Sequence, residues 1–141
     1  MLGHFQKDGI ELRYPNTWHA ELEEVGDSWT LVLQSPEMAF LLVSLRPDAV
    51  DATHLADEAL EALRTEYPQL EVQAALGQCA GQLAIGHDLE FITVDTCITC
   101  WTRCLEASAG PLLLMGQTSD YDHDRNEGIL QAICRSLTLE D

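Results

Sequence analysis

Three cysteines close together in the sequence are the residues whose type and spacing most suggest chemistry. Cys97 and Cys100 form a Cys-x-x-Cys pair, and Cys104 follows four residues later. A Cys-x-x-Cys turn supplies two of the four ligands of a tetrahedral zinc site. The surrounding threonines, isoleucine and tryptophan predict a strand instead, in which residues three apart point to opposite faces. Cys97 and Cys100 should then diverge, whereas Cys100 and Cys104 should share a face.

We therefore interpret these cysteines as buried thiols, because free cysteine packs as a small hydrophobic residue. No second Cys-x-x-Cys pair completes a zinc site, and this pair does not open a helix, where a redox thiolate would be stabilised. The odd total of five cysteines favours free thiols over a disulfide framework. A metal or redox role for Cys97, Cys100 and Cys104 is the alternative, with Cys79 or a histidine as a further ligand.

The alternating acids Asp120, Asp122 and Asp124 resemble the start of a calcium-binding loop. Arg125 stands where that loop needs glycine, and Gln131 stands where it needs a bidentate glutamate. Acids are also favoured at the positive end of a helix dipole. We therefore expect these residues to begin a helix rather than to bind calcium.

The five histidines are scattered, and no two have the spacing of a helical metal site. His87 beside Asp88 resembles an oriented general base, but neighbours in a strand point to opposite faces. Motifs for a serine nucleophile, a phosphate-binding loop or a dinucleotide are absent from the sequence. We expect no catalytic residue and no cofactor, no metal ligand beyond the cysteine alternative, and hence no enzyme.

Two helices are predicted among the elements that position these residues. The first begins at Asp51 or Thr53 and ends before Pro68, and the second is capped by Ser119 or Asp120. Each carries apolar residues at helical spacing. Those of the first helix are Leu55, Ala59, Ala62, Leu63 and Tyr67, and those of the second are Ile129, Ile133 and Leu137.

Alternation of apolar and polar residues predicts strands before the first helix and three or four strands between the helices. The latter are a short strand at residues 71–75 and longer ones near residues 81–91, 95–107 and 112–118. Successive strands joined by short turns imply an antiparallel sheet. We expect an α+β fold, mainly an antiparallel β-sheet covered by helices on its faces, in a single domain over residues 1–141.

An aromatic-proline corner, Tyr14-Pro15-Asn16-Thr17-Trp18, ends the opening strand. It is followed by the strand segment His87-Asp88-Leu89-Glu90-Phe91 and the closing helix segment Ile133-Cys134-Arg135-Ser136-Leu137. In this order the chain resembles the PsbP-like superfamily, which includes a photosystem subunit, a Ran-binding import factor and bacterial DcrB-type proteins. The resemblance implies an α/β/α sandwich that acts in binding, chaperoning or assembly, without a catalytic constellation.

The charge of the chain is strongly negative, with 24 acids against 7 lysines and arginines and a formal net charge of −17. Such a surface repels phosphate backbones and anionic lipids, so we expect neither nucleic-acid nor membrane binding. No apolar run approaches the roughly 20 residues of a membrane span. The first residues lack the basic cluster and apolar segment of a signal peptide, which predicts a cytoplasmic protein.

These observations predict a cytoplasmic protein-binding, chaperone or assembly module. Its partner is expected to be a protein with basic or apolar segments that meets an exposed face or edge of the sheet. An exposed edge would also allow a homodimer. The alternative function is that of a thiol-metal or redox protein using Cys97, Cys100 and Cys104.

Overall fold

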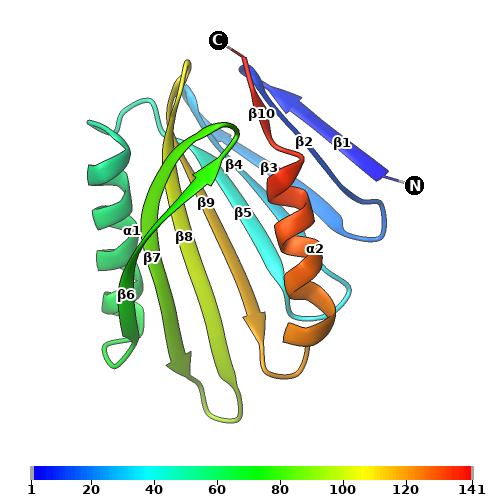
Figure 1. Ribbon diagram of the computed structural model, residues 1–141, viewed down its shortest axis with the longest axis vertical. Helices are drawn as coiled ribbons and strands as arrows, with labels where there is room; N and C mark the ends of the chain where they lie inside the picture. The colour runs from blue at the N-terminus through cyan, green and yellow to red at the C-terminus, as the bar shows by residue number, and fades with distance from the viewer. Residues whose placement is uncertain (1, 141) are drawn as a thin grey trace.

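The computed structural model describes residues 2–140, which form two antiparallel sheets and two helices (Figure 1). Neither helix in this range is long and apolar enough to cross a membrane. The helices are α1 (Ala52–Glu66) and α2 (His123–Arg135). The strands are β1 (Leu2–Lys7), β2 (Ile10–Pro15), β3 (His19–Val25), β4 (Ser28–Gln34), β5 (Phe40–Leu45), β6 (Glu71–Cys79), β7 (Gln82–Ile92), β8 (Cys97–Ala107), β9 (Gly110–Ser119) and β10 (Thr138–Leu139).

The larger sheet has seven strands in the order β3-β4-β5-β9-β8-β7-β6, and every neighbouring pair is antiparallel. The smaller sheet has the order β1-β2-β10, so that the last strand pairs with the second one. The predicted α+β class with a mainly antiparallel sheet is therefore confirmed. The small sheet was not expected, because the pairing of β2 with β10 joins residues more than 120 positions apart. Strand β1, which pairs with its neighbour β2, was not expected either.

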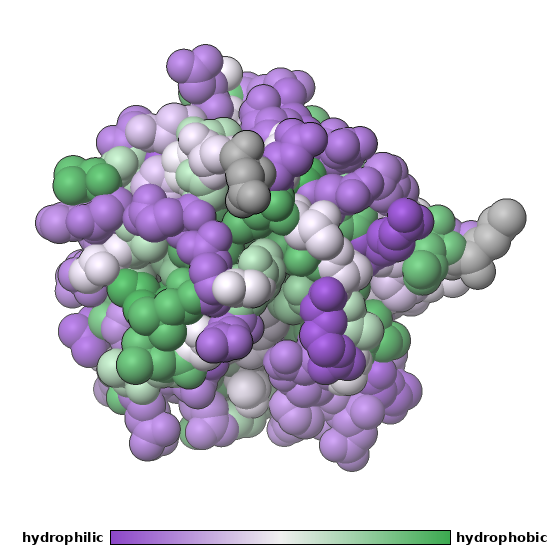
Figure 2. Space-filling view, turned by 45° about the horizontal axis from the view of Figure 1, so that its top comes forward, coloured by the Kyte–Doolittle hydropathy of each residue, from purple (hydrophilic) through white to green (hydrophobic). Residues whose placement is uncertain are grey.

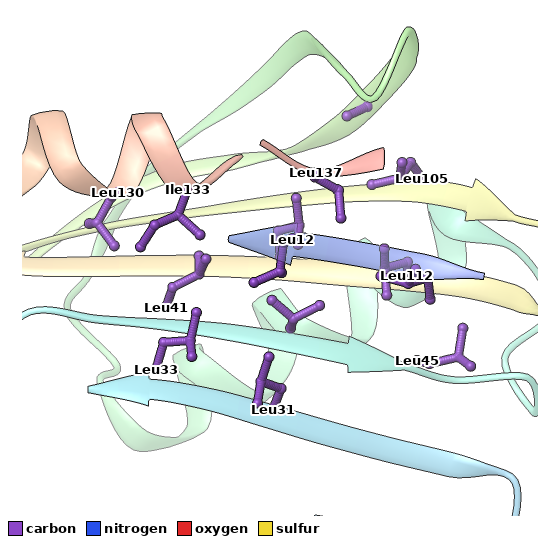
Figure 3. Close-up of a cluster of buried hydrophobic side chains, with 14 of the residues drawn as sticks. Leu12, Leu31, Leu33, Leu41, Leu45, Leu105, Leu112, Leu130, Ile133 and Leu137 are labelled. Atoms are coloured by element: carbon purple, nitrogen blue, oxygen red, sulfur yellow. The ribbon is translucent and has the colours of Figure 1, made fainter. Parts of the chain in front are cut away.

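The two faces of the large sheet are covered by different layers (Figure 1). On one face, Leu55 and Ala56 of α1 pack against Cys104 and Leu113. On the other face, α2 and the small sheet lie over the apolar side chains of β4, β5, β8 and β9, as Figure 3 shows. This arrangement confirms helices on both faces. The main core consists of Ile10, Leu12, Leu31, Leu33, Leu41, Leu45, Leu105, Leu112, Leu130, Ile133 and Leu137, among others.

The small sheet is also tied to the large one by a tryptophan of β4. The Nε1–H group of Trp29 donates a hydrogen bond of 2.9 Å to the carboxylate of Asp8, in the turn between β1 and β2. The rings of Phe5 and Trp29 lie 5.2 Å apart in a tilted arrangement, which suits aromatic pairs. These contacts hold β1 and β2 over the sheet.

Helix α1 follows its predicted start but turns a slightly different face to the sheet. Asp51 is its N-cap, and the carboxylate accepts a hydrogen bond of 2.8 Å from the amide of His54. Ala62 is exposed, contrary to the prediction, whereas Leu60 packs against the core. The buried stripe centres on Ala56 and the residues one and two turns later, which places Leu60 inside it and Ala62 outside it.

Helix α2 begins later than predicted, with Asp122 rather than Ser119 or Asp120 as the N-cap. Ser119 still belongs to β9, which begins two residues earlier and ends one residue later than the predicted 112–118. Strand β6 extends from Glu71 to Cys79 instead of ending at residue 75. Its extra length arises because the turn to β7 is formed by Ala80 and Gly81, whose positive φ angles of 52° and 79° give the tight type I′ connection of hairpins.

We expect Asp122→Asn to destabilise the fold by about 1–3 kcal/mol at about pH 7, because a buried acceptor loses part of its hydrogen bonding. Asp122 is 1% exposed and accepts hydrogen bonds from the amides of Met38, at 2.9 Å, and Ser119, at 2.8 Å. Burial raises the pKa of Asp122, but these hydrogen bonds outweigh it and lower the pKa below the ordinary 3.8. Urea unfolding of wild type and variant measures the difference.

A group with a lowered native pKa stabilises the fold above its unfolded pKa and loses that contribution as the pH falls through the native pKa. The gap in stability between wild type and Asp122→Asn should therefore shrink below about pH 4. Asp124→Asn, an exposed change in the same turn, should alter stability by less than about 0.5 kcal/mol. A gap that stays constant down to about pH 2 would contradict this role of the Asp122 carboxylate.

Candidate functional site

The structure separates the three cysteines in the way that strand geometry predicted. Cys100 and Cys104 of β8 lie on the face covered by α1, whereas Cys97 has the opposite parity. Burial raises the pKa of both Cys100 and Cys104 to about 12, so that neither forms a reactive thiolate near neutral pH. Among residues 2–140, no three His, Cys, Asp or Glu side chains are placed to hold a metal ion.

The other groups singled out by the sequence are also held apart or used structurally. Asp122 binds backbone amides, and Asp120 accepts a hydrogen bond from Thr96. His87 lies on the α1 side of β7 and Asp88 on the opposite side, as predicted, so the two cannot form an oriented base. Neither these aspartates nor the His87–Asp88 pair brings its functional groups together at one point.

A groove of about 770 Å³ lies between helix α2 and the strands β6, β7 and β8. It is within the range of volumes that ligand sites commonly have. The β6–β7 hairpin forms one wall by curling out of the sheet toward the end of α2 (Figure 1). At the hairpin tip, Cys79 and Ala80 pack against the main core, and a second hollow lies there between the tip and the end of α2.

Gly86, midway along β7, makes close packing of this hairpin against β8 possible. A Cβ atom on Gly86 would lie 1.9 Å from the carbonyl oxygen of Thr102 on the neighbouring strand β8. Only glycine fits such an approach of two backbones. The position of the wall formed by β6 and β7 thus depends on a residue without a side chain.

The floor of the groove is formed by Trp101 and Arg103 of β8. The Trp101 ring lies over Gly116, where a Cβ atom would come within 2.4 Å of it. Its Nε1 atom is buried and has no hydrogen-bond partner among the described residues. The Arg103 guanidinium lies 6.0 Å from the Trp101 ring centroid and donates hydrogen bonds to Asp88 at 2.9 Å and to the Thr102 carbonyl at 2.7 Å.

The walls of the groove carry an excess of negative charge. Glu71 and Glu90 stand directly opposite each other in the β6–β7 register, Asp88 follows on the same face, and α2 contributes Glu127. Arg103 is the single basic residue among those that line the groove, and it is already paired with Asp88. Like charges opposite each other on neighbouring strands destabilise a sheet. A cation entering the groove would relieve this repulsion.

Sequence reasoning did not identify the groove residues as a site, although part of the signal was present. The acids Asp88 and Glu90 occupy the polar parity of β7, and Arg103 interrupts the apolar parity that Trp101 and Leu105 share. Their meeting with Glu127 depends on the curl of a hairpin and the placement of a helix. Neither can be read from alternation along one strand.

No protein-family model and no curated protein sequence matches the chain. Solved structures do resemble it over nearly its whole length. CyanoP from Synechocystis sp. PCC 6803 superposes with a TM-score of 0.67 at 14% identity, covering 99% of this chain and 92% of that one. The protein PA94 of unknown function, from Pseudomonas aeruginosa, gives 0.60 at 14% identity, with coverages of 99% and 98%.

LpqN, described as involved in cell envelope biogenesis of Mycobacterium tuberculosis, gives a TM-score of 0.57 at 16% identity and covers 100% of this chain and 90% of that one. At such low identities the likeness concerns the fold. The resemblance to PsbP-like proteins that the sequence indicated is thus confirmed at the level of architecture.

Thiol titration of the native protein should show Cys100 and Cys104 reacting far more slowly than Cys97. Both buried thiols have a pKa near 12, and the half-exposed Cys97 lies on the other face of β8. A disulfide reagent applied at about pH 8 counts the thiols that react quickly in the folded protein, and subsequent unfolding exposes those that react slowly. Loss of a quickly reacting thiol in Cys97→Ser identifies Cys97 as one of the first group. Rapid reaction of Cys100 and Cys104 in the folded protein would revive the thiol-metal or redox alternative.

Gly116→Ala should destabilise the protein by about 1–3 kcal/mol, because the new methyl group meets the Trp101 ring and an overpacked core must shift. The double variant Gly116→Ala, Trp101→Leu should lose less than the sum of its two single changes, because the clash is then absent. Denaturant unfolding of the four proteins measures this coupling. Additive losses would show that the ring does not lie over Gly116.

Proposed function

We propose that this protein is a non-enzymatic binding module that receives a cationic segment of a partner protein in the groove between α2 and the β6–β7 hairpin. The observation that carries the proposal is the set of four carboxylates, Glu71, Asp88, Glu90 and Glu127, around a single arginine that is already paired. Charge complementarity of this kind steers a partner and fixes its position.

The overall charge supports the same class of partner. With a net charge of −17 the whole molecule attracts basic segments, and the groove concentrates this attraction where two walls face each other. The molecular face shown in Figure 2 is covered mainly by hydrophilic side chains, with apolar patches between them. LpqN, whose fold is similar, is described as involved in cell envelope biogenesis.

The chemistry of the groove supports binding rather than catalysis. The thiols at its far end are Cys79 and Cys134, and burial raises the pKa of each, that of Cys134 to about 12. A thiol of such a pKa is a poor nucleophile at neutral pH. Arg103 donates its hydrogen bonds to Asp88 and to backbone carbonyls, so its guanidinium stabilises the floor of the groove.

Binding of a fluorescent lysine peptide, as long as β6, should weaken about tenfold when Glu71, Glu90 and Glu127 are all changed to Gln, since exposed ion pairs contribute up to about 1 kcal/mol each. Fluorescence anisotropy at low ionic strength measures the dissociation constant. A glutamate peptide of the same length should not bind. Added salt should weaken the lysine complex, because it screens the charges.

The matched control removes the same number of charges from the opposite edge of the sheet. Glu21, Glu23 and Glu24 of β3 are exposed, and changing all three to Gln alters the net charge equally. This variant should bind the lysine peptide nearly as well as the wild type, since its charges lie outside the groove. Equal weakening by both triple changes would mean that the peptide responds to overall acidity, and the groove would then not be the site.

A further inference from the structure

We infer that the partner segment binds as an added β-strand along the free edge of β6, with cationic and apolar residues in alternation. This inference rests on the proposed function and specifies how the groove is occupied. Its first support is the position of β6, which is the last strand of the seven-stranded sheet and pairs only with β7 among the described residues. An edge strand presents a row of unpaired backbone groups that another chain can use.

The turn between β6 and β7 determines which backbone groups are free. In a two-residue type I′ hairpin the residues that flank the turn, here Cys79 and Gln82, exchange both backbone hydrogen bonds. Hydrogen-bonded and non-hydrogen-bonded pairs then alternate along the ladder. The residues whose N–H and C=O groups point away from β7 are therefore Val72, Ala74, Leu76 and Gln78.

The two edges of the large sheet are protected very differently. Strand β3 carries Glu21, Glu23 and Glu24 among its seven residues, and such charges discourage pairing with another chain. Strand β6 has a single charged residue, Glu71, at its first position, and its register with β7 is unbroken over nine residues. It contains neither proline nor a bulge, which are the other usual means of blocking an edge.

The free edge of β6 also lies along the groove. The groove is lined by residues from both ends of β6, from Glu71 to Cys79, and across from them by Glu127, Gln131 and Cys134 of α2. A strand added to β6 would therefore lie beside α2 and over the floor of the groove. That floor contains Trp101, which is 9% exposed as a residue and whose buried Nε1–H group has no acceptor among the described residues.

The two faces of β6 specify the side chains of the added strand. Glu71 and Gln73 point to the groove face, next to Glu90 and Asp88, so cationic residues fit this side. Leu76 is on the other face, where it is 73% exposed, and Leu83 of β7 on the same face is 61% exposed. Apolar residues fit that side. A second copy of the chain lacks this pattern and carries the same net charge of −17, so the occupant is a different protein.

The probe is a capped peptide of alternating lysine and valine with the length of β6. In an antiparallel pair, directly opposite residues share a face, so the valines exchange hydrogen bonds with Val72, Ala74, Leu76 and Gln78. N-methylation of the valine amides should therefore weaken binding at least about tenfold. N-methylation of the lysine amides, on the outer edge of the peptide, should leave binding within about twofold of the parent peptide. All three peptides have the same charge.

A change in the protein gives an independent readout. Ala74→Pro removes one outward N–H group and keeps the ladder to β7, because proline is tolerated where an edge N–H faces solvent. It should weaken the lysine-valine peptide about tenfold, whereas Ala74→Val should leave its affinity unchanged. Thermal unfolding verifies that both variants are folded. Hydrogen exchange of the wild type should show protection of the amides of Val72, Ala74, Leu76 and Gln78 on binding.

The outcomes separate this inference from the proposed function. If all three peptides bind equally and Ala74→Pro has no effect, while the glutamine changes at Glu71, Glu90 and Glu127 weaken binding, strand addition is wrong and the groove remains the site. If the lysine peptide binds through those three acids and the lysine-valine peptide does not bind, strand addition alone is wrong. If neither peptide binds, or if both bind independently of those three acids, both are wrong. A dimer in sedimentation that the peptide does not dissociate would also overturn the inference, because a second copy would then occupy the edge.

Discussion

A seven-stranded sheet is wider than any single element that can cover it, and the rest of the structure depends on this constraint. With strands about 4.8 Å apart the sheet spans roughly 29 Å, whereas a helix is about 10 Å across. Both faces of the sheet are apolar near the centre and must be buried. One helix covers β7, β8 and β9 on one face, and the other face needs α2 together with the small sheet.

The small sheet fills the part of that face which α2 leaves open. Its strand β2 places Ile10 and Leu12 over the apolar residues of β4 and β5, and β10 links this layer to the end of α2. The strands β1 and β2 lie on the side of α2 that faces away from the β6–β7 hairpin, so this layer does not extend over β6, β7 and β8 (Figure 1). The region over β6, β7 and β8 is therefore covered only by the curl of its own hairpin.

That uncovered region explains both the shape and the chemistry of the groove. Its floor is not apolar enough to require a layer of its own, because the charged Arg103 stands level with Leu114 of β9 and Val43 of β5 and is paired with Asp88. Trp101 gains burial by lying over Gly116. The walls then supply more carboxylates than the single Arg103 can pair, since the acids of β6, β7 and α2 meet across the opening. The edge strand β6, whose single charged residue is Glu71 at its first position, borders the same opening.

The sequence by itself determined the local geometry of this protein. Alternation along β8 predicted that Cys100 and Cys104 share a face and that His87 and Asp88 on β7 diverge, because side-chain direction in a strand repeats every two residues. The N-cap at Asp51 could also be predicted, because its side chain bonds to an amide within the first turn of the same helix. The ends of elements were less well predicted, as at Asp122, where a buried carboxylate bonded to a distant loop decides the start of a helix.

Only the tertiary structure decided where these local pieces meet. The meeting of Glu71, Glu90 and Glu127 across one groove combines a hairpin curl with the placement of a helix more than 30 residues away. The pairing of β10 with β2 joins the two ends of the described chain. Such contacts are set by which surfaces remain to be buried once the large sheet has formed. Which surfaces are buried together depends on the whole chain, so the periodicity of a single segment cannot predict it.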